Sequence, residues 1–450
     1  MKKSVRILTI LTVLALAAGA FSCTSALPGT DVNDPAGATK ETSGPAEATE
    51  EAPEPSETPK DTFGYRPLDF KAENLSWEIQ NVFAGDYVKN ETVMFIDKGD
   101  TKALMYKIDK VISVTSYNGR KKYEEGRDYE VVDGKLRVTE NSKIPCITSK
   151  RYYSGDGTLV VDVDGEKKPV YWGEGTAMTN YQVNVEYTHS DAWNGYKQQC
   201  FAGIYDKLYK KFENGEDVTI VFYGDSCTYG AASSFAYNYS PYQYSYALLV
   251  TNALADIFGY TVHYEKPKLA GTGPVPKKDY VAGDRGTITY VNNSVGGWTT
   301  ADGVSNFDKY VKPYIEKYGC DLFVVDLGGN DGNIPPEKTA ANDKAIIDRA
   351  IALAPDSGVI IMSTLLNRPD SNWAGNDAHQ EPLLVELSGK LRDEGIPCAV
   401  CGITSMTASV LERIKFEDFS GNNINHPNDF WARLYANTLF ETLVGYGNLS

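Results

Sequence analysis

Two patterns of hydrophobic and polar positions divide the chain near residue 210. Between residues 63 and 205, short runs alternate apolar and polar side chains with a period of two, which is typical of strands with one buried face. These runs lie at 93–96, 110–114, 129–132, 136–138, 158–163 and 181–187. Asp133-Gly134 and Asp164-Gly165 separate runs as hairpin turns do. We therefore predict an antiparallel β-sandwich over residues 63–205.

After residue 215 the apolar runs become continuous. They lie at 218–223, 288–291, 322–327, 359–362 and 398–400, and segments with helical periodicity separate them, such as 245–258, 343–352 and 383–394. Continuous apolar runs are typical of parallel strands that are buried on both faces. The alternation of strand and helix predicts a doubly wound three-layer α/β/α domain over 215–450, with its ligands at the carboxyl ends of the strands.

The N-terminus has the pattern of an export signal. Three cations precede an uncharged apolar stretch at 7–21. The segment closes on Ala-Phe-Ser-Cys, ending at Cys23, which resembles the lipobox of bacterial lipoproteins, whose cysteine is lipidated. We predict a lipoprotein signal peptide at 1–23 and a cell-surface protein that is anchored to the bacterial membrane through Cys23. The alternative is a secreted protein in which Cys23 is not lipidated.

Residues 24–62 form a segment of different composition. It contains six prolines among Ala, Thr, Ser and Glu, no aromatic residue, and nine acids against two lysines. Such a segment cannot offset the entropy of ordering the chain, so we predict a disordered acidic tether. The whole chain carries 44 Lys+Arg against 60 Asp+Glu, a net charge of −16. This balance argues against nucleic acid as a partner and limits membrane contact to the N-terminal lipid.

Four polar segments stand where chemistry is expected in an α/β domain. The first buried strand runs into Ser226 through Gly-Asp, a sharp turn that presents a hydroxyl beside helix N–H groups. The next two strands are followed by Gly297 and by Asn330, a backbone and a side-chain donor of the kind that stabilises an oxyanion. The last helix is preceded by His426. Together these residues indicate nucleophilic catalysis.

In this order, the four segments resemble the SGNH branch of the GDSL family, serine esterases and lipases with a flavodoxin-like fold, over roughly residues 215–450. The resemblance implies that Ser226 is the nucleophile and one backbone oxyanion donor. It also implies Gly297 as the second backbone donor, Asn330 as the side-chain donor and His426 as the general base. No cofactor and no metal are implied.

One position departs from the family pattern. The family has an Asp three residues before the histidine, and this chain has Asn423 there. An amide oxygen can accept the imidazole N–H, but it cannot stabilise the imidazolium by charge, and the loss of the acid can cost as much as about 10⁴ in turnover. Three alternatives stay open: a Ser-His-Asn triad, a Ser-His dyad oriented by a backbone carbonyl, or a catalytically impaired relative.

Aromatic residues near these segments suggest the substrate. Tyr237 and Tyr239 follow the nucleophile turn, and Trp298 follows Gly297, so their rings are candidates for stacking on sugars. These two tyrosines belong to a cluster, and about half of its members are expected to pack in the following helix instead. The cluster consists of Tyr237, Tyr239, Tyr242, Tyr244 and Tyr246. No long apolar segment offers a lipase lid. We therefore expect an esterase that removes short acyl groups, above all acetyl, from carbohydrate or another small ester. A glycan-binding lipoprotein and a lipid-acyl esterase are the alternatives.

Cysteine usage adds little to this picture. Cys398 and Cys401 form a C-x-x-C that lies in or at the end of a predicted strand, with no second pair and no nearby histidine. Zinc sites require four such ligands, so we expect buried thiols here.

Overall fold

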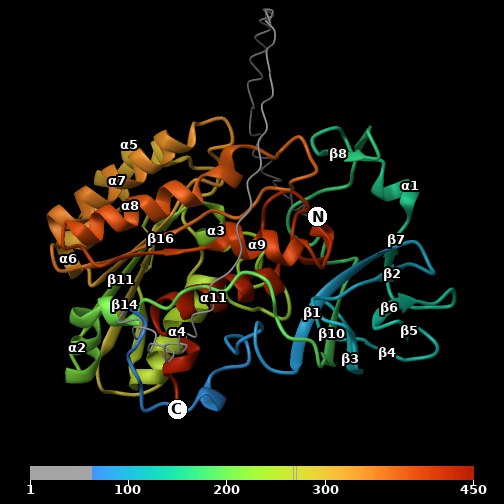
Figure 1. Cartoon of the computed structure of the whole chain (residues 1–450), viewed down its shortest axis with the longest axis horizontal. Coiled ribbons are helices and arrows are strands. Elements are labelled where there is room, and N and C mark those ends of the chain that lie inside the picture. The colour runs from blue at the N-terminus through green and yellow to red at the C-terminus, as the bar shows by residue number, and fades with distance from the viewer. Residues whose placement is uncertain (1–62, 267, 270) are drawn as a thin grey trace, which may run out of the picture. The chain divides into compact units, whose positions relative to one another are not determined.

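The computed structural model describes residues 63–266, 268–269 and 271–450 (Figure 1). All of them belong to one compact unit, Pro59–Ser450, which includes both predicted regions, 63–205 and 215–450. The predicted signal peptide, the lipidation site Cys23 and the tether lie outside the described residues. Within the described part of the chain, no helix is long and apolar enough to cross a membrane.

A seven-stranded sheet forms the centre of the α/β region, in the order β13-β12-β14-β11-β15-β16-β17. Its strands are β11 (Val218–Gly224), β12 (Thr261–Tyr264), β13 (Tyr280–Val281), β14 (Thr287–Asn292), β15 (Leu322–Asp326), β16 (Gly358–Met362) and β17 (Cys398–Cys401). All pairs are parallel except that of β13 with β12 at the edge. The five predicted strands have the flavodoxin-like order 2-1-3-4-5, so the topological switch point lies at the end of β11.

Helices cover both faces of this sheet (Figure 1). Alternate side chains of β11 point to opposite faces: Val221 and Tyr223 pack with one set of helices, and Ile220 and Phe222 with the other. The first set is α5 (Thr300–Tyr310), α6 (Lys312–Tyr318), α7 (Pro336–Leu353) and α8 (Glu381–Asp393). The second set is α2 (Asp206–Asn214), α4 (Tyr246–Phe258), α9 (Ile403–Leu411) and α11 (Asp429–Leu443). The predicted three-layer α/β/α class is confirmed.

The N-terminal region is rich in antiparallel sheet, as its alternating pattern predicts. A five-stranded sheet contains, in spatial order, β4 (Lys122–Tyr123), β3 (Lys110–Ser116), β10 (Gln182–Thr188), β1 (Tyr87–Ile96) and β7 (Cys146–Ile147). A smaller sheet contains β2 (Thr101–Lys102), β6 (Lys135–Val138) and β5 (Tyr129–Val132), and a hairpin contains β8 (Val160–Val163) and β9 (Glu166–Pro169). Val114 of the first sheet and Leu136 of the second belong to one hydrophobic core. Among the described strands of these N-terminal sheets, only the β1–β7 pair is parallel.

The two regions are bound to each other at the start of α11. Asn428, the N-cap of α11, donates from Nδ2 to Thr92 Oγ1 at 2.9 Å and to Gln182 Oε1 at 3.0 Å. Gln182 Nε2 in turn donates to the carbonyl of Ser420 at 2.8 Å. Strands β1 and β10 therefore hold both ends of the loop 420–428, which carries His426.

Candidate active site

Ser226 lies at the switch point, at the start of the short helix α3 (Ser226–Tyr229). Asp225 caps this helix by accepting the N–H of Cys227 at 2.9 Å. A side chain at Gly224 would meet Thr228 Oγ1 at 2.3 Å and the carbonyl of Asp326 at 2.5 Å, so only glycine allows the turn. The serine is 8% exposed, so only a small part of it is open to solvent.

His426 reaches Ser226 from the loop between α10 (Phe416–Phe419) and α11. Its Nε2 lies 3.0 Å from Ser226 Oγ, which is hydrogen-bonding distance. Asn422 shapes this loop, because its Oδ1 accepts the backbone N–H groups of Ile424, Asn425 and His426, each at 2.9 Å. One buried amide therefore fixes the backbone that presents the imidazole.

Glu174 occupies the other side of the imidazole. Its Oε2 lies 3.0 Å from His426 Nδ1, although the two residues are 252 positions apart. Asn422 Nδ2 donates to Oε1 at 2.9 Å, and the Tyr237 hydroxyl donates to Oε2 at 2.8 Å. Burial by itself would raise the pKa of Glu174, but the hydrogen bond and charge of His426, together with these two donors, lower it to about 2. The carboxylate is therefore charged at neutral pH.

Asn423 forms no hydrogen bond with the imidazole, so of the three alternatives the structure does not show the Ser-His-Asn triad. It is fully buried, with a left-handed backbone at φ 71°. Its Oδ1 accepts a hydrogen bond from Arg368, and its Nδ2 donates to the carbonyl of Tyr171 at 2.7 Å. The backbone N–H of Gly173 donates to the carbonyl of Asn422 at 3.2 Å. Asn423 thus docks the segment that carries Glu174, and this role needs an amide donor that an Asp would lack.

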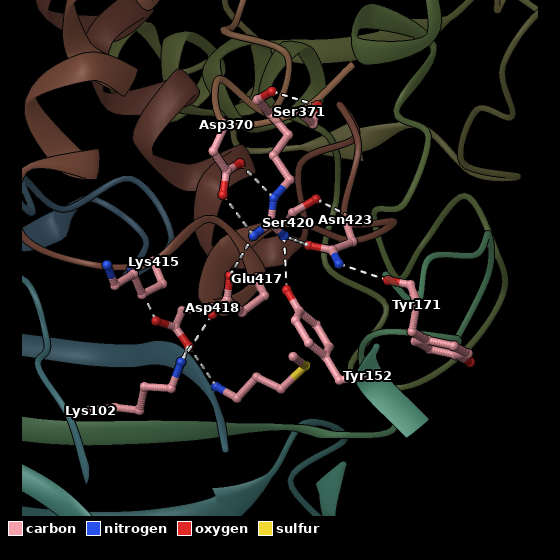
Figure 2. A network of polar contacts seen from close by, with 12 residues as sticks. Lys102, Tyr152, Tyr171, Asp370, Ser371, Lys415, Glu417, Asp418, Ser420 and Asn423 are labelled. Carbon is pink, nitrogen blue, oxygen red and sulfur yellow. Dashed lines mark hydrogen bonds and ion pairs between the residues drawn. The ribbon is translucent and has the colours of Figure 1, made fainter. Parts of the chain in front are cut away.

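Asn423 belongs to a buried polar network, which it joins through Arg368 (Figure 2). Arg368 also donates to Tyr152 OH at 3.0 Å and to Glu417 Oε2 at 3.4 Å, and Glu417 pairs with Lys102 at 3.1 Å. Burial disfavours the charge of Glu417, but the charges of Lys102 and Arg368 outweigh this effect and lower its pKa to about 2. The network joins the N-terminal sheets to the loop of His426 through charges that are mutually compensated.

Gly297 and Asn330 lie beside the nucleophile turn. The N–H groups of Ser226 and Gly297 take no part in the hydrogen bonds that hold the described turns and loops. Asn330 Nδ2 donates to Asp225 Oδ2 at 3.2 Å and to the carbonyl of Trp298 at 3.0 Å. Burial and the charge of Asp326 raise the pKa of Asp225 well above its ordinary value. Both amide protons of Asn330 are thus engaged, and one of them has to leave its acceptor before the amide can bind an oxyanion.

The three aromatic candidates lie in different settings. Tyr237 lies at the site, but its hydroxyl contacts Glu174. Trp298 packs edge-on against Tyr310, with ring centroids 4.6 Å apart, and belongs to the rim of the core. Tyr239 lines a separate cavity. Trp298 is partly buried, and its contact with substrate stays a prediction.

Among the described residues, Cys398 and Cys401 are free thiols that are buried in β17. In the same part of the chain, no group of three or more His, Cys, Asp or Glu side chains could hold a metal ion.

A serine hydroxyl bonded to one imidazole nitrogen, with a carboxylate on the other, is the arrangement of serine hydrolases. Residues 220–396 match the family model described as GDSL-like lipase/acylhydrolase. The match begins after Glu174 and ends before His426. No curated protein matches the chain.

Among solved structures, the chain is similar to a two-domain esterase active on acetylated mannans, with 17% identity and a TM-score of 0.38. That alignment covers 55% of this chain and 54% of the other, about half of each. An acetylxylan esterase from Geobacillus stearothermophilus has 13% identity and a TM-score of 0.35, covering 52% of this chain and 96% of its own. An α/β hydrolase from the metagenome of Lake Arreo, Spain, has 15% identity and a TM-score of 0.36, covering 51% and 95%. These scores decide neither substrate nor mechanism.

Sequence reasoning missed Glu174 and Asn422. Glu174 stands between two glycines, in Trp-Gly-Glu-Gly-Thr, and a lone acid in a glycine-rich loop has no distinguishing pattern. Only tertiary packing brings it to the histidine. Asn422 is adjacent to the position where the family has its acid. Its amide, which can both donate and accept hydrogen bonds, was the one sequence feature that could have indicated a role for it.

Proposed function

We propose that this protein is an extracellular serine esterase that removes short acyl groups, above all acetyl, from carbohydrate. The observation that carries the proposal is the hydrogen-bonded chain Ser226, His426 and Glu174, with 3.0 Å at each step. Ser226 Oγ attacks the ester carbonyl while His426 Nε2 takes its proton. The imidazolium that forms is stabilised by Glu174, and it then protonates the leaving alcohol.

The negative charge of the tetrahedral intermediate is assigned to three donors. These are the N–H groups of Ser226 and Gly297 and the amide of Asn330, which turns away from Asp225 as the oxyanion develops. Water then attacks the acyl-enzyme, with His426 as general base, and releases the acid. No step in this sequence requires a cofactor.

The surroundings of Asn330 favour a polar substrate with a small acyl group. A cavity of about 190 Å³ adjoins this residue, and its walls consist mostly of glycine and amide side chains around one indole: Asn333, Asn367, Asn372 and Trp373. Amide groups match sugar hydroxyls, and an indole ring offers a face for stacking. A long acyl chain would find few apolar partners here, so an acylated carbohydrate is the better fit.

The test compares Ser226→Ala with wild type on p-nitrophenyl esters of two to twelve carbons. We expect Ser226→Ala to lose turnover and wild type to prefer acetate, since the cavity is small and polar. Ser305→Ala is the matched control, because that exposed hydroxyl bonds only a carbonyl of its own helix. Equal inertness of wild type and Ser226→Ala would refute an enzyme, and a preference for long chains would indicate a lipid-acyl esterase. Released acetate from a panel of acetylated glycans then identifies the carbohydrate.

We also propose that the protein is tethered to the cell surface by lipid on Cys23, with residues 24–62 as spacer. The lipobox-like tetrapeptide and the acidic, proline-rich composition support this proposal. In cells, wild type should partition into detergent and Cys23→Ser into the aqueous phase. Aqueous partitioning of both would leave a secreted protein.

A further inference from the structure

A second and larger cavity lies between the N-terminal sheets and the segment that follows the nucleophile turn. Its volume is about 700 Å³. Three cations line it, Arg120, Lys121 and Lys143, and no acid does. The remaining lining residues are uncharged, and Tyr239 and Tyr242 are among the rings that they contribute. A wall with three positive charges and no negative one is unexpected in a chain whose net charge is −16.

These cations are available for a ligand. All three are exposed, and none of them forms an ion pair with any residue that the structure describes. Of the three acids that closely follow Tyr123, Glu124 and Asp128 both pair with Arg127, at 2.7 and 2.6 Å, and the third, Glu125, does not line the cavity. The cavity therefore keeps a local positive field that the acidic remainder of the chain does not neutralise through contact pairs.

The cavity adjoins the site of Ser226 through two shared segments. Thr176 lines it and stands two residues after Glu174, and Tyr239 lines it two residues after Tyr237. Two residues span at most about 7 Å between Cα atoms. Ser240 Oγ donates to the carbonyl of Asn118 at 3.1 Å. This hydrogen bond joins the segment of Tyr237 and Tyr239 to the turn between β3 and β4. One extended ligand could thus contact both the cavity and the mouth of the active site.

The chemistry of the lining selects a sugar that carries a carboxylate. Tyrosine rings offer faces for a pyranose ring, and amide and hydroxyl groups match its hydroxyls. A guanidinium binds a carboxylate through two parallel hydrogen bonds, and neighbouring ammonium groups add charge. We propose that this cavity binds a uronic acid unit of the glycan, so that the preferred substrate is an acidic, acylated polysaccharide. As a statement about substrate, this inference rests on the proposed esterase function.

Binding tests the cavity without requiring turnover. The probe is a xylo-oligosaccharide that carries one glucuronic acid and no acetyl group, measured by calorimetry on the full chain. The comparison probe is the same oligosaccharide after reduction of its carboxyl group to a neutral alcohol. The triple variant Arg120→Gln, Lys121→Gln, Lys143→Gln removes the charge but keeps polar side chains of similar length. Lys122→Gln is the matched control, because Lys122 is exposed on the same strand pair but does not line the cavity.

We expect wild type and Lys122→Gln to bind the acidic probe with equal affinity and the triple variant to bind about tenfold more weakly, with little remaining salt dependence. The reduced probe should bind all three proteins with the same weak affinity. Hydrolysis of p-nitrophenyl acetate should be equal in all three, and its absence would count against the esterase function and not against the cavity. Equal affinity of wild type and triple variant for the acidic probe would overturn the inference. Displacement of that probe by equimolar glucose 6-phosphate would also overturn it, in favour of a phosphate site.

Discussion

Replacing Glu174 with Gln removes the charge beside His426 and turns one of the two accepting oxygens into a donor. The amide has the same shape, so the segment 171–174 keeps its contacts through Tyr171 and Gly173. A charge pair at 3.0 Å is worth about 1.4 kcal/mol when screened as in water and about 5.5 kcal/mol at an effective dielectric constant of about 20. The Glu174 side chain is 44% exposed, so screening keeps the energy below the upper limit, and we expect about 2–4 kcal/mol.

This energy applies to the transition state, in which the imidazole becomes charged, so kcat should fall by about 30- to 1,000-fold. KM for p-nitrophenyl acetate should change little, because Glu174 does not reach the acyl group. The assay is steady-state hydrolysis at neutral pH, where a pKa of about 2 keeps wild-type Glu174 charged. Glu166→Gln is the control, since this acid lies in the same hairpin region and pairs only with Lys168 on the surface. An unchanged kcat in Glu174→Gln would refute the stabilisation of the imidazolium by Glu174 and would favour a Ser-His dyad.

Three further changes test the supporting structure. Asn422→Ala should lower the free energy of unfolding in urea by about 2–4 kcal/mol and abolish most activity, because three backbone N–H groups lose their acceptor and Glu174 loses one of its donors; a stable, active variant would contradict this. Asn423→Asp should reduce activity, since a carboxylate would face the carbonyl of Tyr171; a rise in rate would mean that position 423 supports the histidine after all. Burial raises the pKa of Glu91 to about 8, so the folded protein holds a proton that the unfolded chain releases near pH 4, and stability should fall as pH rises from about 4 to 8. Glu91→Gln should flatten that part of the melting-temperature profile, and an identical slope would contradict the raised pKa.

The α/β region could be predicted closely because its signals are local. The continuous apolar run at 218–223 became β11, and the last helix, which the sequence places after His426, became α11. Ser226 and His426 were found because each stands at the end of a regular element, where such folds place their chemistry. Strand β12 was missed because a four-residue strand with two polar positions lacks a strong pattern.

The carboxylate could not be predicted, because it depends on packing between segments that are far apart in the chain. The family pattern directed attention to Asn423, three residues from the histidine, whereas the acid that contacts His426 lies 252 residues earlier. Glu174 reaches His426 because Tyr171 and Gly173 bind to the loop of Asn422 and Asn423. The local pattern of apolar and polar residues does not predict such a contact. The N-terminal sheets, for which the sequence suggested no chemistry, thus supply part of the site.

The most direct test of this account is covalent labelling of the serine. Wild type, Glu174→Gln and Ser226→Ala are incubated with a fluorophosphonate, and the adduct is located by mass spectrometry while its rate of formation is followed. The account predicts a single adduct on the peptide of Ser226, formed rapidly in wild type, slowed by about 30-fold or more in Glu174→Gln and absent from Ser226→Ala. Equal labelling rates in wild type and Glu174→Gln would contradict it, as would an adduct on any other residue.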